Sequence, residues 1–151
     1  IHAGWRGTLA RIVHKTMQEM AFAYKTEPKH LKAVIGPGIS MENFEVGDEV
    51  YEAFEQAAFP MAEIAAQYPN AAFKANPEER ERMAAEGNID QLLKWHINLP
   101  LCNKEILTHC GVLEENIHDC GICTFAHSDE YFSARKLGTD SGRIYTAIML
   151  K

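Results

Sequence analysis

The 151-residue sequence has no long apolar run and no pattern of a targeting segment. None of its apolar stretches approaches the roughly 20 residues that a membrane-spanning helix needs. Its first residues also lack the charged, apolar and small-residue regions of a signal peptide. These absences exclude a membrane as a partner, and they predict a cytoplasmic protein.

Clustered basic residues are also missing. The sequence contains 15 lysines and arginines against 21 aspartates and glutamates, which gives a net charge of −6. Nucleic-acid binding requires a surface where lysine and arginine gather to neutralise phosphates. The basic residues here are scattered along the chain, so a nucleic acid is excluded as a partner.

Cysteine is scarce, with four residues that all lie in the last third of the chain. Four cysteines so placed are too few for a disulfide framework in a chain of this length. We therefore expect free thiols. The sequence shows no internal repeats or low-complexity tracts, and its length suits one domain (residues 1–151) with a core of its own.

The apolar residues that are present predict alternating helices and strands. Those between Thr8 and Tyr24 recur at steps of three and four, which predicts one continuous helix with Thr8 as its N-cap. Further helices are expected at 48–58, 77–87 and 99–110, and strands at 32–35, 116–124 and 143–150. This interspersed order indicates a layered α/β or α+β domain without fixing the order of its strands.

Asn103 is an exception within the helix predicted at 99–110. It shares one face with Leu99, Cys102, Ile106 and Cys110. An amide on an apolar face needs hydrogen-bond partners if it is buried. The sequence does not identify those partners.

The first eight residues, IHAGWRGT, concentrate reactive side chains among small ones. Glycines let a backbone approach a ligand, and a guanidinium suits phosphate or carboxylate. Arg6 beside a helix start therefore suggests an anion pocket. A packed turn in which Arg6 stacks on an aromatic ring or pairs with an acid explains the pattern equally well. His2, placed on an expected strand, is either a structural residue or a metal ligand.

Two later segments carry weaker signals. Cys120 and Cys123 have the CxxC spacing of redox and zinc sites, but a single such pair is more typical of structural thiols. Ser133, Arg135 and Arg143 lie in a glycine-rich polar segment. Its arginines could bind an oxyanion or only balance the acidic surface.

Several motifs together resemble one family, the YfiH family of laccase-domain proteins. In chain order they are HAGWRGT (2–8), IGPGI (35–39), FEVGDEV (44–50), WHINLPLCN (95–103), CT (123–124) and YFSARKLGTDSGR (131–143). They span nearly the whole chain, and HAGWRG is unusually specific. Members of the family were once labelled polyphenol oxidoreductases and are now regarded as zinc-dependent purine nucleoside phosphorylases with adenosine deaminase activity.

The resemblance implies an α+β fold with an α/β/β/α arrangement of layers and mixed sheets. It also implies a zinc ion held by two histidines and one cysteine, of which the last ligand corresponds to His2. The other two lie upstream in the family. We accordingly expect this chain to be the C-terminal portion of a YfiH-like domain, truncated at its N-terminus. None of the four cysteines corresponds to the ligand cysteine.

The resemblance also implies the substrates, which are adenosine, inosine, guanosine and methylthioadenosine, with inorganic phosphate as co-substrate. Arg6 is our candidate for holding that phosphate, together with the helix start expected at Thr8. Ser133 and Arg135 are candidates for further contacts to phosphate or ribose. Zinc would acidify a bound water for deamination.

Three other functions remain open at this point. A copper-dependent polyphenol oxidoreductase would need clusters of histidine and cysteine ligands, and the seven histidines form no local array. A Cys/His hydrolase is compatible with the fold, but fold analogy is a weak argument. The third alternative is a non-catalytic domain.

Overall fold

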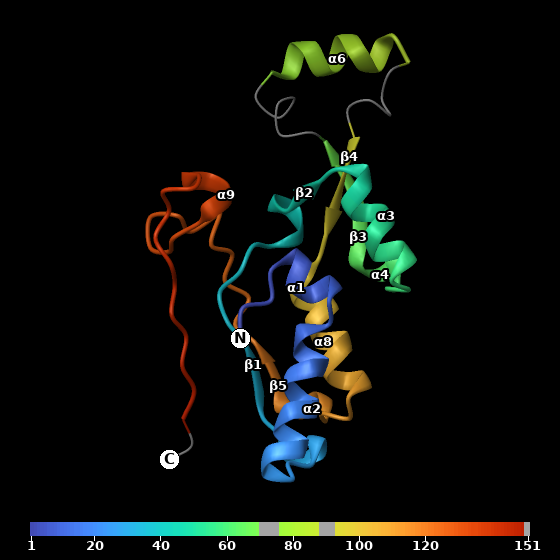
Figure 1. Ribbon diagram of the computed structural model, residues 1–151. Coiled ribbons are helices and arrows are strands. Elements are labelled where there is room, and N and C mark those ends of the chain that lie inside the picture. Colours follow the sequence, from blue (N-terminus) through green and yellow to red (C-terminus); the bar gives the residue numbers. More distant parts are fainter. Residues whose placement is uncertain (70–75, 88–92, 150–151) are drawn as a thin grey trace. The chain divides into compact units, whose positions relative to one another are not determined.

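The computed structural model describes residues 1–69, 76–87 and 93–149. These residues form two compact units (Figure 1). One unit contains residues 1–40 together with the chain from Leu99 onward, and the other contains Met41–Asn98. Each unit has its own sheet and its own helices.

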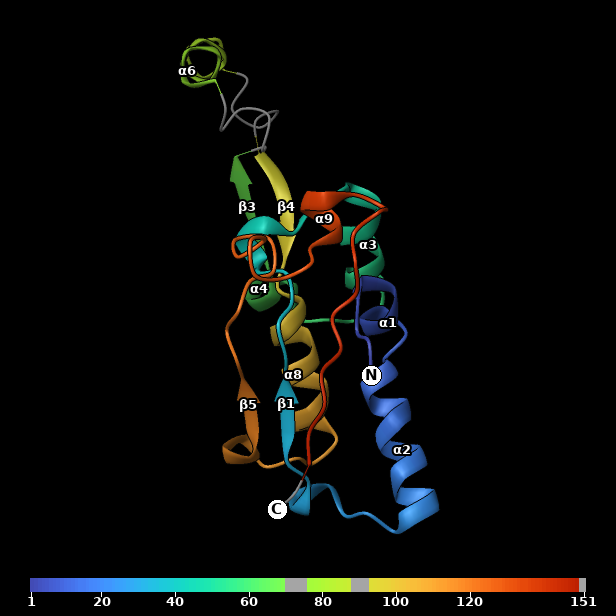
Figure 2. The ribbon, with the colours of Figure 1, turned by 90° about the vertical axis from the view of Figure 1, so that its left-hand side faces the viewer.

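The first unit is built around helix α8 (Leu99–His109). This helix contacts α1 (Trp5–Leu9) and α2 (Ile12–Tyr24), and it also contacts strands β1 (Ala33–Ile35) and β5 (Ile117–Asp119). β1 and β5 run parallel, with Ala33 opposite Ile117 (Figure 2). The remaining elements of the unit are the short helices η1 (Pro28–His30), η3 (Glu114–Asn116) and α9 (Ala134–Leu137).

The second unit is an antiparallel sheet with helices. Its strands β2 (Glu45–Val46), β4 (Leu93–Ile97) and β3 (Ala65–Pro69) lie in the order β2-β4-β3. Phe54, Ile64 and Ile97 are fully buried in its core. Its helices are η2 (Met41–Asn43), α3 (Asp48–Gln56), α4 (Met61–Ile64) and α6 (Pro77–Ala85). One parallel and one antiparallel sheet in the same chain confirm the expected α+β class with mixed sheets.

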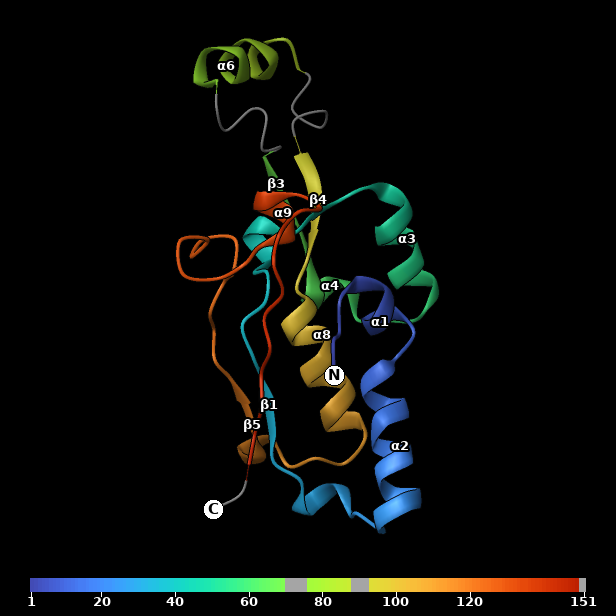
Figure 3. The same ribbon diagram turned by 60° about the vertical axis from the view of Figure 1, so that its left-hand side comes forward.

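The first predicted helix is wrong in two respects. It does not run unbroken from Thr8 to Tyr24, because Arg11 takes a left-handed conformation with φ 53° and separates α1 from α2 (Figure 3). The residue with a left-handed conformation at a helix end is usually a glycine, so the arginine at position 11 did not indicate a break in the helix. Thr8 is also not an N-cap. It lies inside α1, whose N-cap is Gly4, and His2 precedes the helix without belonging to a strand.

The last predicted strands also differ from the structure. The strand expected at 116–124 is limited to Ile117–Asp119. Residues 143–149 form no strand, and Tyr145, Ile148 and Met149 are exposed. Their alternating pattern is typical of a strand, but a strand also requires a hydrogen-bonded neighbour. Leu150, the last residue of that prediction, lies outside the described residues.

No helix in the described part of the chain is long and apolar enough to cross a membrane.

Candidate active site

The opening segment, residues 2–8, forms a small open pocket. Its cavity of about 270 Å³ is lined by His2, Gly4, Trp5, Arg6 and Gly7. Gly4 has an extended conformation, with φ −66° and ψ 175°, and the chain enters α1 immediately after it. One imidazole and one guanidinium therefore line the same cavity.

Arg6 stacks on its neighbour. Its Cζ lies 4.1 Å from the centroid of the Trp5 ring. This is the stacking that the packed-turn interpretation expected. It also leaves the edge of the guanidinium free, because the Arg6 side chain makes no hydrogen bond or ion pair with another described residue. A guanidinium that stacks through its face keeps its N–H donors for an anion, so the packed turn and the anion pocket are compatible.

His2 is exposed and lies against Gly4. A β-carbon added at Gly4 would lie 2.9 Å from His2 Nε2, so an alanine there would displace the imidazole from this position. The imidazole bonds to no other described residue. It is thus available to a ligand.

A metal ion would need more donors than His2 supplies. Structural and catalytic zinc sites use three or four protein ligands. Across residues 1–69, 76–87 and 93–149, no group of three or more histidine, cysteine, aspartate or glutamate side chains is arranged to hold a metal. His2 suits the role of one ligand, and the described residues do not complete a site.

A buried side-chain pair anchors the opening segment to α8. Thr8 is fully buried, and its Oγ1 donates a hydrogen bond to the carbonyl of Ala3 at 3.0 Å. Asn103 is 7% exposed, and its Nδ2 donates to Thr8 Oγ1 at 3.0 Å and to the carbonyl of Leu99 at 2.8 Å. These are the partners that the sequence required without identifying. The role of Thr8 in this chain of hydrogen bonds was missed, since a threonine near a helix start is typical of a cap.

Ser133 and Arg135 do not line the pocket of the opening segment. Ser133 is 3% exposed and immediately precedes α9, while Arg135 lies exposed on that helix. The phosphate role suggested for a helix start at Thr8 must also be revised. The helix α1 begins at Trp5, and the N–H of Thr8 is not available to a ligand, because it donates to the carbonyl of Gly4 at 2.8 Å.

The four cysteines are free. Burial raises the pKa of the Cys102 thiol to about 12. Burial alone would also raise the pKa of Cys123, but hydrogen bonds from Ser40, Phe125 and Ala126 outweigh it and lower that pKa. One of these runs from the Ser40 N–H to Cys123 Sγ at 3.3 Å. Cys123 therefore has the backbone environment of a stabilised thiolate, although it is buried.

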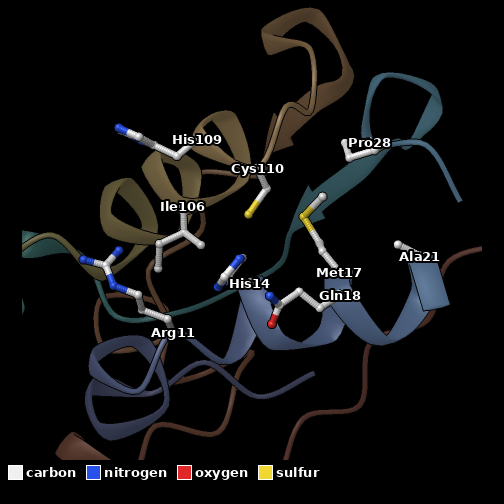
Figure 4. Close-up of a pocket in the computed structure, with 9 residues that line it drawn as sticks. All are labelled: Arg11, His14, Met17, Gln18, Ala21, Pro28, Ile106, His109 and Cys110. Atoms are coloured by element: carbon white, nitrogen blue, oxygen red, sulfur yellow. The ribbon is translucent and has the colours of Figure 1, made fainter.

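A larger cavity between α2 and α8 was not anticipated from the sequence. It measures about 480 Å³, and Figure 4 shows His14 of α2 and Cys110, just after α8, pointing toward each other across it. His109 points away from them (Figure 4), and it is hydrogen-bonded through Nδ1 to the carbonyl of Glu105 at 2.8 Å. Residues 14 and 110 are too far apart in the sequence for spacing to reveal this pair.

Comparison with known proteins places all of residues 1–151 in the family described as multi-copper polyphenol oxidoreductase laccase. The chain is 39% identical over 150 residues to a purine nucleoside phosphorylase of Bacteroides thetaiotaomicron, covering 99% of this chain and 48% of that protein. It is 37% identical over 150 residues to adenosine deaminase RL5 of an unknown prokaryotic organism, covering 99% of this chain and 49% of that protein.

Two solved structures share the fold. YlmD of Geobacillus stearothermophilus superposes with a TM-score of 0.66 at 21% identity, covering 89% of this chain and 42% of that one. YfiH of Bacillus licheniformis gives 0.63 at 22% identity, covering 89% and 43%. The chain thus spans about half the length of the proteins it matches.

Proposed function

Since this chain belongs to the family described as multi-copper polyphenol oxidoreductase laccase, we propose that its intact protein is a purine nucleoside phosphorylase with adenosine deaminase activity. The resemblance to the YfiH family drawn from the motifs is confirmed. The substrates in this proposal are adenosine, inosine, guanosine and methylthioadenosine. A cytoplasmic location is part of the same proposal.

The observation that carries the proposal is the pocket of the opening segment. Phosphorolysis needs inorganic phosphate held against the ribose C1′ while the base departs. Arg6 presents free N–H donors at a cavity with His2, which suits a small anion. An oxygen of the bound phosphate would form a bond to ribose C1′ as the glycosidic C1′–N bond breaks, giving ribose 1-phosphate and the free purine, which takes up a proton from solvent. Ser133 and Arg135 remain proposed as additional contacts to phosphate or ribose. They are weaker candidates than Arg6, because neither lines this pocket.

His2 is the one residue of this chain that we propose as a zinc ligand. Its imidazole would provide one ligand, and the ion would acidify a water for the deamination of adenosine to inosine and ammonia. Among the described residues, no group of three or more histidine, cysteine, aspartate or glutamate side chains is arranged to complete the site. Arg6 can bind phosphate whether or not a metal is present.

The decisive experiment incubates the intact protein with adenosine and with inosine, each with and without phosphate. Chromatography should find hypoxanthine and ribose 1-phosphate from inosine only when phosphate is present. Adenosine without phosphate should yield inosine. Absence of phosphate-dependent base release would refute the phosphorylase assignment.

Copper-dependent oxidation of phenols is the second candidate, favoured by the family's description alone. Metal analysis of the purified intact protein separates the two. About one zinc per chain supports the phosphorylase, and several copper ions per chain with oxygen uptake on a phenol support the oxidase.

A further inference from the structure

The hydrogen bonds from α8 to the opening segment have a fixed direction. A carbonyl oxygen can only accept, so the hydroxyl proton of Thr8 is used on Ala3. The same hydroxyl must then accept from Asn103, and the second proton of that amide is used on Leu99. The orientation of the Asn103 amide follows from its partners.

This orientation leaves Asn103 Oδ1 buried without a donor in the described part of the chain. A buried acceptor without a partner costs stability, whereas a leucine of similar volume at this position would not. Asn103 lies on the apolar face of α8, next to the fully buried Cys102. The packing of α8 therefore does not explain why residue 103 is an asparagine.

The end of this chain of hydrogen bonds lies beside His2. The carbonyl of Ala3 belongs to the peptide group that joins Ala3 to Gly4, between His2 and Arg6 in sequence. The neighbouring backbone is also closely packed. The Gly4 carbonyl accepts from the Thr8 N–H at 2.8 Å, and a β-carbon at Gly7 would lie 3.3 Å from the His2 carbonyl. The hydrogen bond at Ala3 is linked through the Thr8 hydroxyl to Asn103 of α8.

We propose that Asn103 and Thr8 are positioning residues for the reaction proposed above. They fix the Ala3–Gly4 peptide group and thereby hold the His2 imidazole and the Arg6 guanidinium on the same cavity. This inference rests on the proposed function for the identity of the reaction. The positioning itself concerns only residues of this chain.

The test replaces Thr8 in the intact protein. Thr8→Val removes the hydroxyl at nearly constant shape and should lower kcat/KM for phosphorolysis about 10- to 100-fold, because small misplacements are costly in catalysis. Thr8→Ser keeps the hydroxyl and should stay within about threefold of the wild type. The matched control is Thr16→Val, since Thr16 Oγ1 donates only within α2, to the carbonyl of Ile12 at 2.9 Å. It should not change kcat/KM.

Asn103→Leu keeps the proposal testable if Thr8→Val fails to fold. Its loss of kcat/KM should match that of Thr8→Val, while its urea unfolding midpoint equals or exceeds that of the wild type. A residue that only supports the fold would lower the midpoint. Wild-type kcat/KM in folded Thr8→Val or Asn103→Leu would overturn the inference.

A readout without substrate separates this inference from the proposed function. The NMR signals of the His2 imidazole should shift in Thr8→Val and return in Thr8→Ser. If the wild type has no phosphorylase activity but these shifts occur, the proposed function fails and the positioning stands. If the wild type is active and neither the signals nor kcat/KM respond, the positioning fails and the function stands.

Discussion

The opening segment (2–8) and the later arginine-bearing segment (133–143) contain the same kinds of residue, namely arginine, glycine and a hydroxyl. In the first, Thr8 is bonded to Asn103, 95 positions away in sequence. In the second, Arg143 donates to the carbonyls of Ser141 and Gly142, one and two positions before it in sequence. Similar composition thus goes with different bonding, because the hydroxyl of Thr8 is tied to a helix distant in sequence and the guanidinium of Arg143 to its immediate neighbours.

The largest expected contrast concerns the thiols near the two segments. Cys102 precedes Asn103 on α8, and its pKa is raised from 9.0 to about 12 by burial. At pH 8 this reduces its thiolate fraction about 1,000-fold relative to an ordinary thiol. Cys123, ahead of the second segment, has a lowered pKa and so a larger thiolate fraction at the same pH. Iodoacetamide labelling of the folded protein, mapped by mass spectrometry, should modify Cys123 before Cys102.

Labelling in urea is the control for that experiment, because both thiols should react once burial is removed. Equal initial rates at Cys102 and Cys123 in the folded protein would show that the two environments do not differ in the way described. Raising the pH toward 10 should accelerate labelling at Cys123 less than at an ordinary thiol, since its deprotonation is complete at lower pH.

The next contrast is between the arginines. Arg6→Ala should raise the KM for phosphate about 100-fold, the loss expected for a charge-assisted contact to an anion, while deamination of adenosine changes far less. Arg135→Ala should change the same KM only a few-fold, since Arg135 lies outside the pocket. Steady-state kinetics with varied phosphate measures both. Comparable effects of the two substitutions would remove the distinction between the segments.

Glycine substitutions should give a smaller contrast. Alanine at Gly4 places a β-carbon 2.9 Å from His2 Nε2 and must displace the imidazole, although φ −66° tolerates alanine. Alanine at Gly142 places its β-carbon 2.7 Å from the Phe132 ring, which is 54% exposed and free to move outward. We expect about a tenfold loss of kcat/KM for Gly4→Ala and less than twofold for Gly142→Ala. Thermal unfolding of both variants checks that each remains folded, and a loss at Gly142 equal to that at Gly4 would contradict the argument.

Sequence patterns predicted much of the fold because apolar periodicity is a local signal. The helix at 99–110 agrees with α8, and the apolar run at 32–35 agrees with β1. The prediction failed where the outcome depends on distant partners or on an unusual residue. The strand expected at 143–150 has no hydrogen-bonded neighbour over its described residues, and Arg11 takes the conformation usually reserved for glycine.

The candidate site was predictable in part. The concentration of His2, Trp5 and Arg6 among glycines identified the segment, and the structure places them on one cavity. Asn103 was recognisable as an amide on an apolar face. Its pairing with Thr8 was not, because 95 intervening residues conceal the contact and a threonine at that position is typical of a helix cap.

The bond between Thr8 and Asn103 also has a consequence for biosynthesis. Thr8 leaves the ribosome 95 residues before its partner. The ribosome adds about 5–20 residues per second, so at least about 5 s pass between the synthesis of Thr8 and that of Asn103 in α8. His2 and Arg6 are therefore synthesised several seconds before Asn103, and during that time the nascent chain contains both side chains without the bond from α8 to Thr8.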